Sequence, residues 1–302
     1  MKTIIFGAGS DLGVHIDGAS LGPGQLINDL QSFYKGEIKL YKQDINIIKS
    51  RNLSDRRKNE YEIDSFNTAL YNGILEKTKE EVFPITIGGD KTISIASSLA
   101  SAKKFKNENI GMIWISAHAD YNTFESTVTG NIAGLSMSAI TGYKNHELRY
   151  YHDGNVIQPA KSVILGVRNI EDSEKENLKY SGINVITDED IKTKGMENAI
   201  NEAFEIASFK TKGIHICFCL DILDSDIAPG ISIPIFDGMN EEQVIELNKL
   251  ILKNIDNIIS YDLLDFNPLK DEKRKTEQIA VNILAQVISA ANKKGRKFER
   301  KY

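Results

Sequence analysis

The sequence predicts an α/β fold, a three-layer α/β/α sandwich around a mostly parallel sheet of eight strands. Short β-branched apolar runs recur along the chain and alternate with longer segments whose apolar residues repeat with a helical period. Several short runs lack polar alternation, which is typical of strands buried on both faces of a parallel sheet. No internal repeat, low-complexity linker or change of composition divides the chain, so we expect residues 1–302 to form a single domain.

The expected elements follow from these patterns in chain order. The strands are the runs at residues 3–6, 38–41, 82–87, 110–115, 162–167, 183–186, 214–220 and 258–264. The helices are the amphipathic segments at residues 64–79, 92–104, 196–209, 241–253 and 277–293.

A glycine-rich stretch at residues 7–13 follows the first predicted strand but does not predict nucleotide binding. Its third glycine stands one position late for the dinucleotide-binding fingerprint. Gly18, Gly22, Pro23 and Gly24 are also expected to interrupt the helix that would receive the phosphates.

Composition and charge exclude several classes of partner. The chain is 41% hydrophobic and 26% charged, as in ordinary globular proteins, and its net charge of −5 gives no reason to expect nucleic acid or an anionic membrane. No uncharged apolar run reaches the roughly 18 to 20 residues that span a bilayer. The apolar stretch at the start is too short for a signal peptide, so we expect a cytoplasmic location.

Soft metal ligands are scarce in this sequence. It contains five His and two Cys, and Cys217 and Cys219 are one residue apart, which is neither a zinc nor a redox spacing. Any metal chemistry would therefore depend on carboxylates and very few histidines.

Polar segments follow four of the predicted strands. In an open α/β sheet, ligands bind beyond the carboxyl ends of the strands. A single aspartate at such an end could merely cap the next helix, but four polar ends predict one shared crevice. The segments are Gly88-Gly89-Asp90-Lys91, Ser116-Ala117-His118-Ala119-Asp120, the pair Asp221 and Asp224, and Asp265-Phe266-Asn267-Pro268.

These segments resemble the motifs of the ureohydrolase family, which includes arginases, agmatinases and formiminoglutamases. Residues 88–94 are similar to the family's Gly-Gly-Asp-His-Ser segment, residues 116–120 to its Asp-Ala-His-x-Asp motif, and residues 217–224 to its Ser-x-Asp-x-Asp-x-x-Asp motif. The resemblance extends over nearly the whole chain and is closest to the arginases, because residues 127–134 match the arginase Thr-x-Ser-Gly-Asn-x-His-Gly loop. It implies an arginase-like fold.

The resemblance to arginases also implies a substrate-binding set. Glu171 and Asp265 stand where arginases have acids of a different length, so this set is only partly retained. Its members are Asn122, Thr129, Glu171, Glu174 and Asp265.

The chemistry implied by the family is metal-assisted hydrolysis, in which two Mn²⁺ ions share a bridging water. The family holds the ions with two His and four Asp, ligand types that hard divalent cations prefer. Three of these six positions are retained here, while Ser116 and Cys219 replace the two Asp that bridge both ions, and Ala133 replaces a proton-shuttling His. The retained positions are His118, Asp120 and Asp221, and Lys91 replaces the third lost ligand, a His.

Lys91 is the decisive substitution. A charged lysine has three donors and no lone pair, so it cannot ligate a metal. We interpret Lys91 as an internal replacement for a metal ion that pairs with Asp120 or Asp221, since an unpaired buried charge is costly. One alternative is that Lys91 is a surface residue that points away from the site.

The functional hypothesis is therefore an arginase-like pseudoenzyme without a cofactor. It has lost binuclear manganese binding and arginine hydrolysis, and it acts as a sensor or regulatory binder of a small cationic amino acid or amine. The alternative is a metal-dependent hydrolase of a guanidino or amidino substrate with weakly held Mn²⁺, or with one Zn²⁺ held by Cys219, His118 and Asp221. A third reading is a structural oligomer scaffold, because arginase relatives form trimers or hexamers.

Overall fold

The computed structural model describes residues 1–50, 52, 54–78, 81–105, 109–144, 148, 154 and 156–299, with side chains up to residue 294. Eight strands form one sheet in the order β2-β1-β3-β8-β7-β4-β5-β6, and every pair of neighbours runs parallel. The strands are β1 (Lys2–Gly9), β2 (Glu37–Lys42), β3 (Val82–Gly88), β4 (Gly111–Ile115), β5 (Ser162–Val167), β6 (Asn184–Thr187), β7 (Ile214–Cys219) and β8 (Ile258–Leu264).

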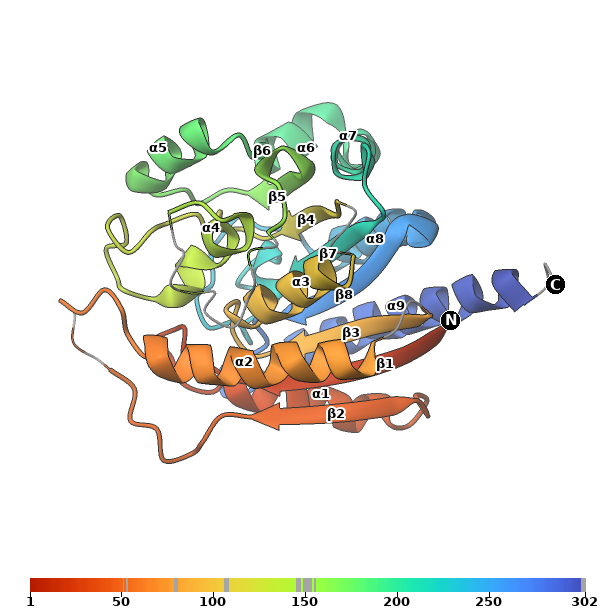
Figure 1. Cartoon of the computed structure of the whole chain (residues 1–302), viewed down its shortest axis with the longest axis horizontal. Coiled ribbons are helices and arrows are strands. Elements are labelled where there is room, and N and C mark those ends of the chain that lie inside the picture. Colours follow the sequence, from red (N-terminus) through yellow and green to blue (C-terminus); the bar gives the residue numbers. More distant parts are fainter. Residues whose placement is uncertain are drawn as a thin grey trace.

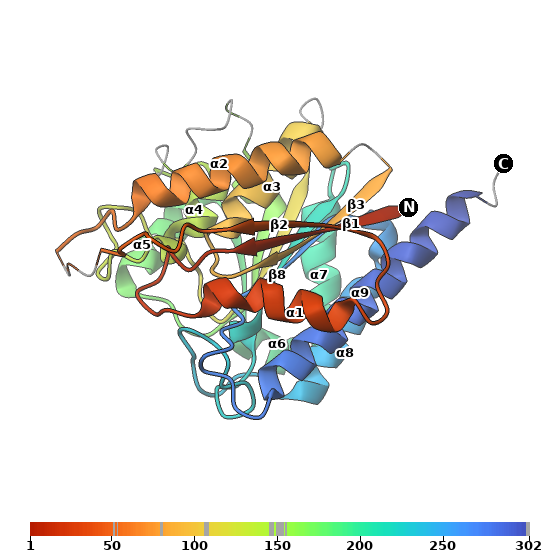
Figure 2. The same cartoon turned by 90° about the horizontal axis from the view of Figure 1, so that it is seen from below.

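Helices cover both faces of the sheet (Figures 1 and 2). One face carries α2 (Glu60–Lys77), α3 (Ile93–Lys104) and α4 (Ser136–Thr141). The other carries α1 (Gly22–Leu30), α6 (Asp188–Lys194), α7 (Met196–Ser208), α8 (Glu241–Lys253) and α9 (Lys275–Glu299). A further helix, α5 (Asp172–Ser181), follows β5.

The two cores follow from the twofold alternation of the buried strands. In β4, Ile113 and Ile115 pack into the core beneath α7 and α8, while Met112 and Trp114 pack into the core beneath α3. Because both faces are covered, the central strands are apolar throughout, and this explains the unbroken apolar runs in the sequence. The predicted three-layer sandwich is confirmed, with a sheet that is entirely parallel.

All eight predicted strands and all five predicted helices are present, but four of the helices described here were not predicted. These are α1, α4, α5 and α6. The expectation that Gly22 and Pro23 interrupt a helix is wrong, because α1 begins at Gly22 and Pro23 occupies its first turn. A proline is favourable there, since the amide it lacks would have no intrahelical partner. The predicted helix end at Lys79 lies outside the described residues.

The four polar strand ends meet because β3, β8, β7 and β4 are consecutive in the sheet. Their carboxyl ends therefore lie side by side at one edge, as the sequence predicts. Among the described residues, no helix is both long and apolar enough to cross a bilayer.

Candidate functional site

A cleft of about 160 Å³ opens above the carboxyl ends of the central strands. Lys91, His118, Asp120 and Asp221 line its floor, whereas Ser116 and Cys219 are completely buried. All five residues of the predicted substrate-binding set also line this cleft, so the structure brings the set together: Asn122, Thr129, Glu171, Glu174 and Asp265.

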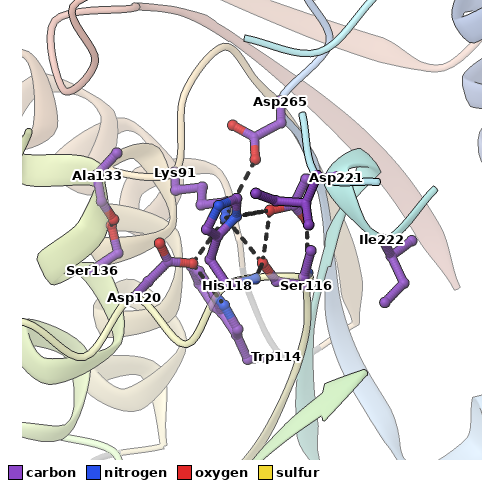
Figure 3. Close-up of polar contacts among 12 residues, drawn as sticks. Lys91, Trp114, Ser116, His118, Asp120, Ala133, Ser136, Asp221, Ile222 and Asp265 are labelled. Carbon is purple, nitrogen blue, oxygen red and sulfur yellow. Dashed lines mark hydrogen bonds and ion pairs between the residues drawn. The ribbon is translucent and has the colours of Figure 1, made fainter. Parts of the chain in front are cut away.

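Lys91 lies at the centre of the cleft floor (Figure 3). It follows β3 at the start of α3, is 4% exposed, and its ammonium donates three hydrogen bonds. The acceptors are Ser116 Oγ at 2.9 Å, Asp120 Oδ2 at 2.9 Å and Asp221 Oδ2 at 2.7 Å. The predicted pairing of Lys91 with these aspartates is confirmed, and the alternative of a surface lysine is wrong.

The charge of Lys91 is stabilised by the carboxylates that surround it. Burial alone would lower the pKa of Lys91, but the attraction of Asp120, Asp221 and Asp265 outweighs it and raises that pKa well above its ordinary value. Burial would likewise raise the pKa of Asp221, yet Lys91 and His118 hold it well below its usual range. Lys91 and Asp221 are therefore a buried ion pair at neutral pH.

Asp221 also organises the residues that follow β4. Its Oδ1 accepts a hydrogen bond from the Ala117 amide at 3.1 Å, and its Oδ2 accepts one from Ser116 Oγ at 3.0 Å. His118 Nδ1 lies 2.6 Å from Asp221 Oδ2, so the imidazole is fixed against the same carboxylate. Ser116 thus serves here as a hydrogen-bonding link within the network.

Two of the cleft aspartates have a left-handed backbone conformation. Asp120 has a φ of 51° and Asp265 a φ of 76°, a region that residues other than glycine seldom adopt. Asp120 Oδ2 also accepts a hydrogen bond from Trp114 Nε1 at 3.2 Å. Strained backbone of this kind concentrates at functional sites, where the surrounding contacts enforce it.

Asp265 differs from the other floor carboxylates because, among the residues that the structure describes, no side-chain donor is given within hydrogen-bond distance of its carboxyl group. Its Oδ2 lies 3.6 Å from Lys91 Nζ, an ionic contact that is too long for a hydrogen bond. Burial raises the pKa of Asp265 well above its ordinary value, and Lys91 only partly opposes this effect. Burial thus favours the neutral form of the Asp265 carboxyl group, which lines the cleft.

Cys219 belongs to a second group of donor atoms beneath the floor. Its Sγ and one carboxylate oxygen each of Asp221 and Asp265 lie within 4.8 Å of one another. The zinc site considered from the sequence had His118 as its third ligand. In the structure the third member of the group is Asp265. Burial raises the pKa of the Cys219 thiol well above its ordinary value, so the thiolate that a metal requires is disfavoured.

The outer end of the cleft is formed by the start of α5. Glu171 and Glu174 form a capping box there, and Glu174 accepts hydrogen bonds from the amides of Tyr121 at 2.9 Å and Glu171 at 3.1 Å. Burial, aided by the charge of Asp120, raises the pKa of Glu174 to about 7. Asn122 Nδ2 donates to Glu171 Oε2 at 3.0 Å.

The loop that carries Thr129 is held from outside by the segment before α2. Thr129 Oγ1 accepts a hydrogen bond from the Asn131 amide at 3.2 Å, and the Thr129 carbonyl accepts one from the buried Lys58 ammonium. Lys58 has no sequence motif that could have indicated this contact, because its partner is a backbone oxygen.

Arg168 is a further organising residue whose role the sequence did not reveal. Its guanidinium donates to five backbone carbonyls, those of Asp221, Ile222, Leu223, Ile235 and Phe236, at 2.8–3.2 Å. It thereby ties the segment that carries Asp221 to residues 232–235, which form one wall of the cleft. The sequence did not predict that residues 232–235 line the cleft, because they include no charged residue and match no motif.

Comparison with known proteins places the site in a family. The family model described as "Arginase family" matches residues 1–289. This chain belongs to the arginase family. It is 31% identical over 296 residues to the arginase of Bacillus subtilis strain 168. The matched region covers 95% of this chain and 98% of that relative. The arginase of Staphylococcus aureus strain COL is also 31% identical, over 292 residues, with coverage of 93% and 94%.

Solved structures agree with this assignment. The arginase of Bacillus caldovelox superposes with a TM-score of 0.86 at 27% identity, over 95% of this chain and 97% of that one. The structure of Bacillus subtilis arginase gives a TM-score of 0.82 at 27% identity, with coverage of 95% and 98%. The predicted resemblance to the ureohydrolases, and to arginases in particular, is confirmed.

The donor set of this arginase-family cleft differs from the two His and four Asp that the resemblance implies for a binuclear manganese centre. An ammonium lies within 2.9 Å of both Asp120 and Asp221, two of the three retained ligand positions, and would repel a divalent cation. Ser116 supplies a hydroxyl and Cys219 a buried thiol at the two positions where the resemblance implies carboxylates. Lys91 therefore occupies, with its charge, the space between the two aspartates.

Proposed function

We propose that this arginase-family protein is a metal-free binder of a small cationic compound and acts as a sensor or regulatory subunit. One observation carries the proposal: the Lys91 ammonium donates to both Asp120 and Asp221 at 2.7–2.9 Å, at the position where the resemblance implies metal. A buried ammonium with three short hydrogen bonds compensates part of the charge of these two carboxylates without a metal.

The charges that line the cleft favour a cation as ligand. Five carboxyl groups border the cleft, whereas Lys91 is the one permanently positive side chain among its described lining residues. Lys91 offsets part of the negative charge of Asp120 and Asp221, and burial favours the neutral forms of Asp265 and Glu174, so a cation in the cleft would compensate the charge that remains. The five carboxyl groups belong to Asp120, Glu171, Glu174, Asp221 and Asp265.

Calorimetry tests ligand binding directly. The protein, purified without chelator, is titrated with arginine, ornithine and agmatine, and we expect saturable heat with at least one of them. Absence of heat with all three contradicts the proposed binding function. Urea release from arginine is measured in parallel, and we expect none above the uncatalysed background.

The second candidate is a hydrolase with an altered, mononuclear metal site. Two observations favour it: the relatives reported above are arginases, and Cys219, Asp221 and Asp265 bring three potential ligand atoms together. Because Lys91 contacts two of these three residues, a metal there requires the ammonium to move or to lose its proton. Stoichiometric metal together with hydrolysis of a guanidino substrate favours this candidate over the first.

We also propose that the chain forms a homo-oligomer, a trimer or hexamer by analogy with its family. Light scattering measures the mass in solution, and a mass of one chain contradicts this proposal.

A further inference from the structure

A second group of polar side chains is completely buried beneath α3, apart from the cleft. His215 and Cys217 are two residues apart on β7 and therefore point to the same face of the sheet, and Asp262 of β8 stands in register with Cys217. None of these three residues lines the cleft. Polar groups at this depth are costly unless their own contacts compensate them.

The donor atoms of the three residues converge on one carboxylate oxygen. Asp262 Oδ2 lies 2.9 Å from His215 Nε2 and 3.3 Å from Cys217 Sγ. His215 Nδ1 lies 3.0 Å from Ser101 Oγ on α3, and this contact fixes the imidazole with Nε2 toward the other two donor atoms. A ring nitrogen, a sulfur and a carboxylate oxygen thus lie within 4.8 Å of one another, and these are ligand types that zinc takes in proteins.

The separations are close to those of a zinc site. With metal–ligand lengths of about 2.0–2.3 Å, neighbouring ligand atoms of a tetrahedral site are roughly 3.3–3.6 Å apart. The separations of 2.9 and 3.3 Å are slightly shorter, so a small outward rotation of the side chains would admit the ion. Ser97 Oγ, which donates to the same Asp262 oxygen, supplies an oxygen for the fourth position.

Two further oxygens beside this group lack hydrogen bonds. Asp262 Oδ1 and Thr86 Oγ1 are buried, and neither has a partner within the part of the chain that the structure describes. Thr86 of β3 stands in register with Asp262, so the two side chains lie on the same face of the sheet. Buried polar atoms are nearly always paired, and an unpaired carboxylate oxygen indicates that a partner from outside the chain, such as an ion, completes the group.

The charges around this group differ from those around Cys219 beneath the cleft. There the Lys91 ammonium competes with a metal, whereas the side-chain partners described for the group beneath α3 are serine hydroxyls. Burial, aided by the charge of Asp262, raises the pKa of the Cys217 thiol well above its ordinary value, so the thiol keeps its proton without a metal. A divalent cation bound to one thiolate and one carboxylate forms a neutral group, which suits complete burial.

We propose that His215, Cys217 and Asp262 form a structural zinc site between β7, β8 and α3. Zinc forms bonds to the imidazole Nε2, the cysteine sulfur and an aspartate oxygen, and the thiol proton passes to the solvent. The site ties two central strands to the helix that covers them. It is separate from the cleft, so it goes beyond the proposed function and leaves the cleft without metal.

Elemental analysis of the full chain tests the site. The protein is produced with zinc in the growth medium and purified without chelator, and we expect about one zinc ion per chain. Cys217→Ser, which keeps a hydroxyl in place of the thiol, is expected to hold far less. Cys219→Ser is the matched control, because it changes the other buried cysteine and is expected to retain the zinc. No zinc in the natural chain, or zinc that Cys217→Ser retains, overturns the proposal.

A spectroscopic measurement on the natural chain does not depend on the folding of any variant. Cobalt(II) in place of zinc gives a thiolate-to-metal charge-transfer band only where a cysteine sulfur is a ligand. We expect this band in the cobalt-loaded natural chain and in Cys219→Ser. Thermal melts are expected to show a higher midpoint for the zinc-loaded chain than for the metal-free chain, because the folded state binds the ion. Bound cobalt without the charge-transfer band overturns the assignment of Cys217 as a ligand.

Discussion

At the scale of single residues, Lys91 determines the charge state of the site. A histidine at this position would leave room for a metal ion, whereas a lysine places its own ammonium among the carboxylates. Burial favours the neutral form of an amine, but two aspartates within 2.9 Å reverse that preference. The ion pair is therefore part of the folded structure, and its removal should be measurable as lost stability.

Lys91→Met tests this role. The substitution leaves Asp120 and Asp221 buried without their cation, and we expect the free energy of unfolding to fall by about 3–5 kcal/mol. Urea denaturation measures the change. The control Lys253→Met removes an exposed lysine that pairs with Glu197 on the surface, and it should change stability by less than about 1 kcal/mol. A loss as small as this in Lys91→Met would show that Lys91 does not neutralise the two aspartates.

The combined substitution Lys91→His, Ser116→Asp and Cys219→Asp tests the assignment of the ligand positions. It supplies the set of two His and four Asp that the resemblance implies, so we expect the folded variant to bind more Mn²⁺ than the natural chain. Arginine hydrolysis should stay low, because Ala133 still replaces the proton-shuttling His. Elemental analysis after dialysis against Mn²⁺ gives the number of manganese ions per chain. A folded variant without manganese contradicts the assignment of residues 91, 116 and 219 to metal-ligand positions.

At the scale of elements, the start of α5 links helix capping to the charge of the cleft. Glu174 closes the capping box, yet it is buried beside Asp120, which leaves its pKa near 7. Since this folded-state pKa lies above the ordinary value of 4.5, the contribution of Glu174 to stability is complete below pH 4.5. It is lost as the pH rises through about 7.

Glu174→Gln tests this linkage. Glutamine also closes a capping box, so the helix start is retained while the titration is removed. We expect the decline in wild-type stability between pH 4.5 and about 7 to become shallower in the variant. Urea denaturation at several pH values measures it, and identical pH profiles would exclude titration of Glu174 as the cause.

Arg168 acts at the same scale by joining two segments. Arg168→Met removes five hydrogen bonds to the carbonyls of residues 221–223 and 235–236, so we expect faster amide hydrogen exchange in residues 221–239. Asp224 and Met239 connect these segments through the Asp224 amide and the Met239 carbonyl, which makes the Asp224 amide a specific reporter. Helix α2 serves as the internal reference. Unchanged exchange at the Asp224 amide would contradict the role of Arg168 in joining the two segments.

Two of the helices that the sequence failed to predict lack an amphipathic pattern, for opposite reasons. In α4 all six residues are buried, so no polar face reveals the helical period. In α5 only Glu174 and Asn177 are buried, which leaves no apolar stripe. The strands were recognisable because continuous burial selects continuous apolar runs.

At the scale of the whole molecule, the order of the strands creates the site. Local patterns predict that polar residues end four strands, but adjacency of β3, β8, β7 and β4 is a property of the complete sheet. Motif spacing was sufficient to predict the floor of the cleft, including the pairing of Lys91. The contacts of Lys58 and Arg168 could not be predicted, because backbone carbonyls accept their hydrogen bonds and leave no pattern in the sequence.

The central claim is that an internal lysine takes the place of metal in an arginase fold. Elemental analysis of the natural chain, purified without chelator and equilibrated with Mn²⁺, tests it most directly. We expect far less than one manganese per chain, with the Lys91, Ser116 and Cys219 triple variant as the positive comparison. Two manganese ions per natural chain, together with urea release from arginine, would contradict the account.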